Sequence, residues 1–174
     1  MHQALGEFLT EMGRVEFRML LLMDFLNEAP LEHLFDEYSG ETFGKKIGLF
    51  KKWCDFGSAP EHKPALQKIY KDLDELRPKR NFIVHGETWE GSFKGKPHQP
   101  YRVGLVKGNL EYLDEFERAE HGPHVFDAQQ VRAATQLCIK ILGALADFRA
   151  KIPVSDVPFE EEPDDPSQWP PPAR

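Results

Sequence analysis

The chain has 174 residues, 40% of them hydrophobic, and a net charge of -7, so it is long enough for one domain with a real core. Its two cysteines, Cys54 and Cys138, form no Cys-x-x-Cys pair, and its apolar run from Met19 to Met23 is far too short to cross a bilayer. We therefore expect a cytoplasmic protein without a disulfide framework, with both cysteines in the core, no signal peptide and no membrane association.

The first helix is predicted from about Gln3 to Asn27, because apolar residues recur there at spacings of three and four. Pro30 prevents much continuation. One charged residue of this helix, Glu16, lies beside the apolar stripe. Two roles are open for it: an ion pair with Arg80 across a helical bundle, or an ordinary exposed carboxylate.

Two shorter segments precede the central helix of the chain. Residues 31–40 should form a short helix or turn, and Thr42 is a candidate cap for a helix from Phe43 to Cys54. The Gly-Ser-Ala-Pro sequence at residues 57–60 predicts a loop.

A third helix is predicted from about Lys63 into the sequence Arg-Asn-Phe-Ile-Val-His-Gly at residues 80–86. The glycine at position 86 is a common residue at a helix end, which places the preceding histidine in the last turn. Pro78 lies within this segment, so we expect a kink or a restart between Leu76 and Arg80.

Three side chains at this helix end are candidates for chemistry: Arg80, Asn81 and His85. Asn81 and His85 are four residues apart and share a face. Arg80 is rotated by about 140° from His85, so the two meet only if the arginine curls back or a second chain contributes. Arg80 also continues the buried stripe of the helix, where an uncompensated charge is costly. In a purely structural interpretation, Arg80 pairs with a buried carboxylate and His85 caps carbonyl groups.

The arrangement Arg-Asn-x-x-x-His-Gly at the end of a leucine-rich helix resembles the signature of the HEPN superfamily (higher eukaryotes and prokaryotes nucleotide-binding domains). That signature is an arginine, four to six residues, and a histidine. The resemblance implies a mainly all-α bundle of four to five helices that is usually dimeric. Many members are metal-independent endoribonucleases, often toxins or defence effectors, and others only bind RNA or nucleotides.

The resemblance also implies roles for individual residues, without a metal or cofactor. His85 would be the general acid–base for attack of a ribose 2′-hydroxyl, and Arg80 and Asn81 would bind and orient the scissile phosphate. Lys79, Arg77 and Glu16 complete the expected substrate-binding set. A non-catalytic RNA-binding or nucleotide-binding module and a structural dimer are the alternatives.

The resemblance extends to partners. A homodimer would bring two copies of the motif into one cleft, and an antitoxin protein is a candidate partner. In a subgroup paired with nucleotidyltransferase antitoxins, a tyrosine follows the histidine by two residues. Glu87 occupies that position here, so regulation through that tyrosine is not expected.

The segment from Phe43 to Arg80 holds ten basic and five acidic residues, a local net charge of +5 in an otherwise acidic chain. A positive surface beside the motif would attract a polyanion such as RNA. The commoner alternative is that these lysines are ordinary solvated residues of two helices.

A small β-hairpin or meander is predicted within residues 87–125, with strands near 88–93, 101–106 and 110–113. Its aromatic residues are candidates either for stacking on bases or for covering the hairpin's inner face: Trp89, Tyr101 and Tyr112. The nearby histidines match no metal-binding pattern, so no structural zinc is predicted: His98, His121 and His124.

The last helix is predicted from Asp127 to about Lys151, because Asp127 and Gln130 form a capping-box pattern before an apolar stripe. Residues 152–174 contain seven prolines, six acidic residues and one basic residue. We therefore expect one domain over residues 1–151 and a disordered acidic tail. Partner binding, shielding of the basic surface and no role at all are open for this tail.

Overall fold

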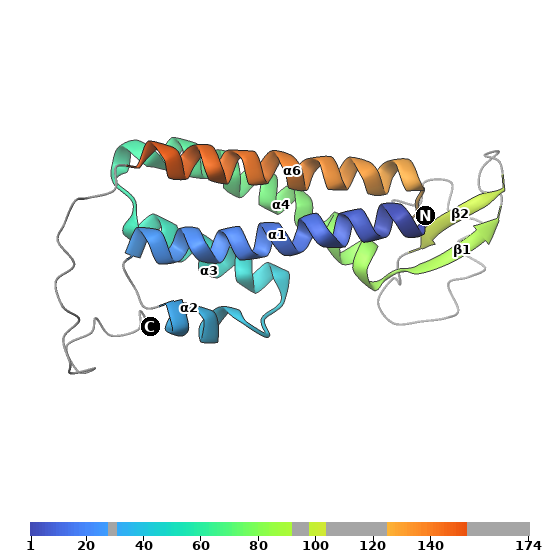
Figure 1. Cartoon of the computed structure of the whole chain (residues 1–174), viewed down its shortest axis with the longest axis horizontal. Helices are drawn as coiled ribbons and strands as arrows, with labels where there is room; N and C mark the ends of the chain where they lie inside the picture. The colour runs from blue at the N-terminus through green and yellow to red at the C-terminus, as the bar shows by residue number, and fades with distance from the viewer. Residues whose placement is uncertain (28–30, 92–97, 104–124, 153–174) are drawn as a thin grey trace.

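The computed structural model describes residues 1–27, 31–91, 98–103 and 125–152. It is mainly helical, with a small antiparallel sheet at one end (Figure 1), which confirms the predicted fold class. The described part contains a short 3-10 turn at Pro60–His62 and five α-helices: α1 (His2–Asn27), α2 (Leu31–Tyr38), α3 (Phe43–Gly57), α4 (Lys63–His85) and α6 (Ala128–Lys151).

Four of these helices form the bundle. α1 packs against α6 and α3, and α4 packs against the same two helices, while the short α2 lies against α1. Their apolar stripes meet in one core, in which Phe8, Phe50 and Leu73 are fully buried. Cys54 and Cys138 are free thiols inside this core, as the sequence predicted.

Local capping signals fix where two helices begin. The hydroxyl of Thr42 accepts a hydrogen bond from the N–H of Lys45 at 3.4 Å. Asp127 and Gln130 form the complete capping box, in which the Gln130 N–H donates to Asp127 Oδ1 and the Asp127 N–H donates to Gln130 Oε1, at 2.8 and 2.9 Å. Both caps follow from short sequence patterns and both predictions are confirmed.

α4 runs without a break through Pro78, which excludes a restart between Leu76 and Arg80, one of the two outcomes expected there beside a kink. Pro78 is exposed, and its ring costs the helix a single backbone donor. Leu76 before it and Ile83 after it are both buried on the same core. Packing on both sides of the proline therefore keeps the helix in one piece.

The sheet follows α4 directly. β1 (Glu87–Gly91), β2 (Gln99–Val103) and β3 (Val125–Phe126) are antiparallel neighbours in that order, with Trp89 opposite Tyr101. Tyr101 is 4% exposed, so it covers the inner face of the sheet rather than offering a stacking surface.

Several predictions concern parts of the chain outside the described residues. These are the strand at 110–113, the residues Tyr112, His121 and His124, and the tail from residue 153 onward. β3 was not predicted from the sequence. No helix of the described ranges is long and apolar enough to cross a membrane.

Candidate functional site

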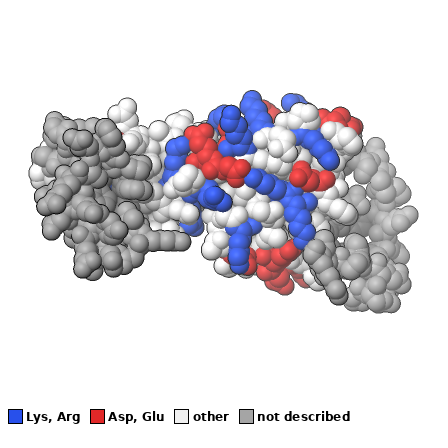
Figure 2. Space-filling model, turned by 180° about the vertical axis from the view of Figure 1, so that it is seen from behind, with Lys and Arg blue, Asp and Glu red and all other residues white. Residues whose placement is uncertain are grey.

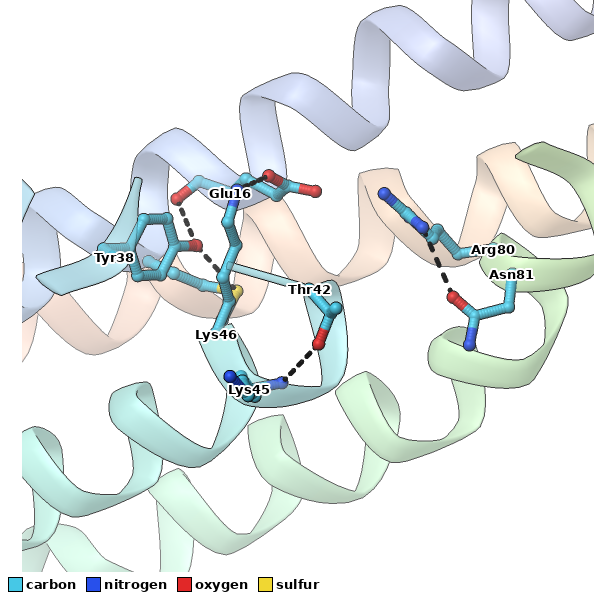
Figure 3. Close-up of polar contacts among 8 residues, drawn as sticks. Glu16, Tyr38, Thr42, Lys45, Lys46, Arg80 and Asn81 are labelled. Carbon is cyan, nitrogen blue, oxygen red and sulfur yellow. Dashed lines mark hydrogen bonds and ion pairs between the residues drawn. The ribbon is translucent and has the colours of Figure 1, made fainter. Parts of the chain in front are cut away.

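The end of α4 brings together the three side chains that the motif singled out. Arg80 Nη1 lies 3.3 Å from Asn81 Oδ1 and also 3.3 Å from His85 Nε2. The contact between Arg80 and Asn81 is drawn in Figure 3. The long arginine side chain reaches along its own helix to His85, five residues later. One chain therefore assembles the cluster without a second copy.

The half-buried guanidinium of Arg80 lacks some of the partners that a charged group needs. Its Nε is buried without a hydrogen-bond partner, and its guanidinium carbon lies 5.9 Å from the ring centroid of Phe43, the first residue of α3. No carboxylate among the described residues forms an ion pair with it. The structural interpretation, in which a buried carboxylate neutralises Arg80, is therefore not observed.

The predicted partner of Arg80, Glu16, is engaged elsewhere. Its Oε2 lies 2.5 Å from Nζ of Lys46 on α3, and its backbone carbonyl accepts a hydrogen bond from the Tyr38 hydroxyl at 2.8 Å (Figure 3). Both side chains of the pair are mostly buried, at 21% and 15% exposed. The prediction that Glu16 faces Arg80 is therefore wrong, because Glu16 pairs with Lys46 of α3. The alternative prediction of an ordinary exposed carboxylate is wrong as well.

His85 is exposed, so its ring is accessible from solvent. A guanidinium can only donate hydrogen bonds, so the contact with Arg80 makes His85 Nε2 an acceptor. A hydrogen bond from the guanidinium requires the tautomer in which Nδ1 carries the proton. An unprotonated imidazole nitrogen is also the group that a general base requires.

The last turn of α4 is held by an arginine that the sequence did not single out. Arg102 of β2 donates from Nε to the carbonyl of Ile83 at 2.8 Å and from Nη2 to the carbonyl of Val84 at 3.3 Å. Its Nη1 also donates to Oγ1 of Thr88 at 3.1 Å. A cation at this position satisfies orphan carbonyls and opposes the negative end of the helix dipole.

α4 ends at His85 with Gly86 as its C-cap, as the sequence predicted. Gly86 has an extended backbone, with φ of −77°, and its N–H donates to the carbonyl of Phe82 at 3.0 Å. The ring of Phe82 also packs against Phe126 of β3, with centroids 4.7 Å apart. Arg102, not His85, therefore satisfies carbonyl groups of the last turn, and the sheet packs against this end of the helix.

The two basic residues preceding Arg80 differ in availability. Lys79 pairs with Glu75 at 2.6 Å, and this hydrogen bond lowers the pKa of the Glu75 carboxyl. Arg77 is exposed and forms no ion pair with a described carboxylate. It lies three residues before Arg80, on the same side of the helix, and its side chain packs near Gly44 of α3. Arg77 is thus a better candidate than Lys79 for binding an anion.

The basic segment does not form a uniform positive surface. Figure 2 shows acidic side chains lying among the lysines and arginines of this face. Five of the ten basic residues between Phe43 and Arg80 form ion pairs: Lys45, Lys46, Lys51, Lys52 and Lys79. Much of the local excess of positive charge is therefore neutralised. Arg80, which contacts His85, and Arg77, three residues before it, form no ion pair with a carboxylate of the described residues.

Within the described ranges, no group of three His, Cys, Asp or Glu residues is placed to hold a metal ion. Comparison with protein-family models, with curated proteins and with solved structures finds no match. Membership of the HEPN superfamily therefore stays a prediction that rests on the motif.

Proposed function

We propose that this protein is a metal-independent endoribonuclease of the HEPN type that cuts RNA through attack of the ribose 2′-hydroxyl. The observation that carries the proposal is the convergence of Arg80, Asn81 and His85 at the end of α4, where no carboxylate of the described residues pairs with Arg80. An arginine held partly buried with no opposite charge is costly. A phosphate group of a substrate would supply the missing charge.

His85 is the acid–base residue of the proposal. Its Nε2 takes the proton of the 2′-hydroxyl while that oxygen attacks the adjacent phosphorus and the bond to the 5′-oxygen breaks. The protonated ring then returns the proton to the leaving 5′-oxygen. The products are a 2′,3′-cyclic phosphate and a 5′-hydroxyl, so atoms and protons balance without a further reactant.

Arg80 is the phosphate-binding residue of the proposal. When its guanidinium turns from His85 to the phosphate, it frees Nε2 and stabilises the negative charge that grows on the phosphate oxygens. The carboxamide of Asn81 accepts a hydrogen bond from the guanidinium and orients it toward the phosphate. Arg77, on the same side of α4, contacts a neighbouring phosphate of the RNA.

The wider role that the resemblance suggests belongs to the same proposal. It is a toxin or defence effector that acts on RNA, works as a homodimer and is neutralised by an antitoxin protein. A site that one chain completes makes dimerisation unnecessary for bringing Arg80 to His85.

The experiment is an RNA cleavage assay in excess EDTA with the wild type, His85→Ala and His33→Ala. His33 is an exposed histidine of α2, so its variant controls for loss of an imidazole away from the motif. We expect wild type and His33→Ala to cut RNA equally, and His85→Ala to be slower by a factor of ~10²–10⁴. Circular dichroism checks that each variant is folded.

Equal cleavage by wild type and His85→Ala would reject the catalytic role of the motif. Tight RNA binding by a wild type that does not cut would favour the non-catalytic binding module. Neither cleavage nor binding would leave the structural dimer as the remaining alternative.

A further inference from the structure

A small depression lies between α1 and α6 at the end of the bundle opposite the motif. It has a volume of about 320 Å³ and is lined mainly by Arg18, Leu21, Leu22, Leu145, Ala146 and Arg149. In Figure 1, α1 and α6 end at this end of the bundle, and α4 begins there. The other end of α4, which carries the motif, lies beside the sheet. The depression is thus separated from the proposed RNA site by much of the bundle's length.

Its chemistry is an apolar surface between two arginines. Arg18 is exposed, and the guanidinium of Arg149 lies over the ring of Phe25, 3.2 Å from the centroid. Neither arginine forms an ion pair with a carboxylate of the described residues. A complementary ligand would combine an apolar group with carboxylates, because an arginine fork binds a carboxylate through two hydrogen bonds.

We propose that the acidic tail of this chain binds in this depression, through its segment Phe-Glu-Glu-Glu at residues 159–162. Charge complementarity favours it, since residues 152–174 carry six acidic residues and one basic residue, a net charge of -5. The phenyl group of Phe159 fits the apolar lining, and the three glutamates that follow pair with Arg18 and Arg149.

The position where the tail begins makes this contact accessible. Ile152, the last described residue, follows the end of α6 directly and comes three positions after the lining residue Arg149. Phe159 lies seven positions after Ile152, and an extended chain spans up to ~3.3–3.6 Å per residue. A short tether of this kind supplies the segment at an effective concentration of order mM, so a weak contact is sufficient.

Docking at this end has a consequence for the rest of the molecule. It keeps the acidic tail away from Arg77 and Arg80. A free tail would be attracted to these two cations at low salt. The inference does not depend on the proposed function, because it concerns the charge and shape of the opposite end of the bundle.

The test compares the full chain with its triple variant Glu160→Lys, Glu161→Lys, Glu162→Lys by methyl NMR. We expect the methyl signals of Leu21, Leu22 and Leu145 to shift in the variant, while that of Ile83 beside the motif stays in place. High salt should produce the same shifts in the wild type, since it weakens exposed ion pairs. The substitutions alter no residue of the helical core, so folding is preserved.

A charge swap sharpens the test. Adding Arg18→Glu and Arg149→Glu to the triple variant should restore the wild-type signals, whereas adding Arg132→Glu, an exposed arginine near the start of α6, should not. Unchanged leucine signals in the triple variant would overturn the proposal, as would shifts confined to α3 and α4. Shifts that depend on protein concentration would assign the depression to a second copy and likewise overturn it.

Discussion

Arg102 provides the sharpest stability prediction, because one side chain holds the end of the motif helix. Arg102→Ala removes two hydrogen bonds to the carbonyls of Ile83 and Val84 and one to Thr88. Hydrogen bonds from a charged group contribute ~1.5–3 kcal/mol each, and a cation at a helix end ~0.3–1 kcal/mol. Water can replace part of this at a half-buried site, so we expect a loss of about 2–4 kcal/mol in the free energy of unfolding.

For a domain of this size, ~1 kcal/mol corresponds to about 2–4 °C in the melting midpoint. Arg102→Ala should therefore melt roughly 5–15 °C below the wild type. Arg102→Lys keeps the charge but loses the planar fork, so its midpoint should lie between the two. Arg132→Ala is the matched control, since Arg132 is exposed on α6, and it should melt with the wild type.

Hydrogen exchange locates the effect. The amide of Gly86 donates to the carbonyl of Phe82 at 3.0 Å, and its protection should fall in Arg102→Ala more than that of the core amides. If Arg102→Ala melts within a degree of the wild type with Gly86 still protected, other contacts hold the helix end and the capping argument is wrong.

Three further predictions concern the core and assembly. Lys46→Ala leaves the mostly buried Glu16 without its cation and should cost about 1–3 kcal/mol of unfolding free energy in urea. The side chain of Lys45 is 68% exposed, so Lys45→Ala should cost under ~0.5 kcal/mol. Equal losses in the two variants would contradict this prediction. Burial raises the pKa of the Cys138 thiol to about 12 and that of Cys54 further. The unfolded chain releases these protons first, so stability should be complete below about pH 8.5 and fall as the pH rises above it, less steeply in Cys138→Ala; a flat profile would refute it. Light scattering should report about twice the 20.0 kDa chain mass if the homodimer forms, and the chain mass itself would reject it.

The parts of the fold that the sequence predicted well are those with local causes. The capping box at Asp127 and the cap at Thr42 involve residues three positions apart, and both are present. Apolar periodicity placed the long helices in the same way. Pro78 does not restart α4, because the buried neighbours on both sides, and not the local backbone preference, decide whether the helix continues.

The geometry of the candidate site was predicted in part. The motif singled out Arg80, Asn81 and His85, but rotamers decide whether the arginine reaches the histidine, and helix periodicity carries no information on rotamers. The partner of Glu16 depends on how α1 and α3 pack, which no short pattern records. Arg102 was missed because it becomes adjacent to α4 only through the pairing of the sheet.

The short strand β3 and the neutralised surface were missed for related reasons. Two residues, Val125 and Phe126, are too few to show an alternating pattern. The count of basic residues from Phe43 to Arg80 was correct, but the carboxylates that pair with them lie on several elements, including α1 and α2. Charge counted along a segment therefore overestimates the field at its surface.

The central claim is that the cluster of Arg80, Asn81 and His85 cuts RNA by activating the 2′-hydroxyl of the RNA's own ribose. The most direct measurement incubates the purified protein in excess EDTA with two oligonucleotides of one sequence, one with ribose and one with 2′-deoxyribose throughout. The account predicts cleavage of the ribose strand alone, with 2′,3′-cyclic phosphate ends, and no such products from His85→Ala. Cleavage of the deoxyribose strand, or 3′-hydroxyl ends on the ribose strand, would contradict it.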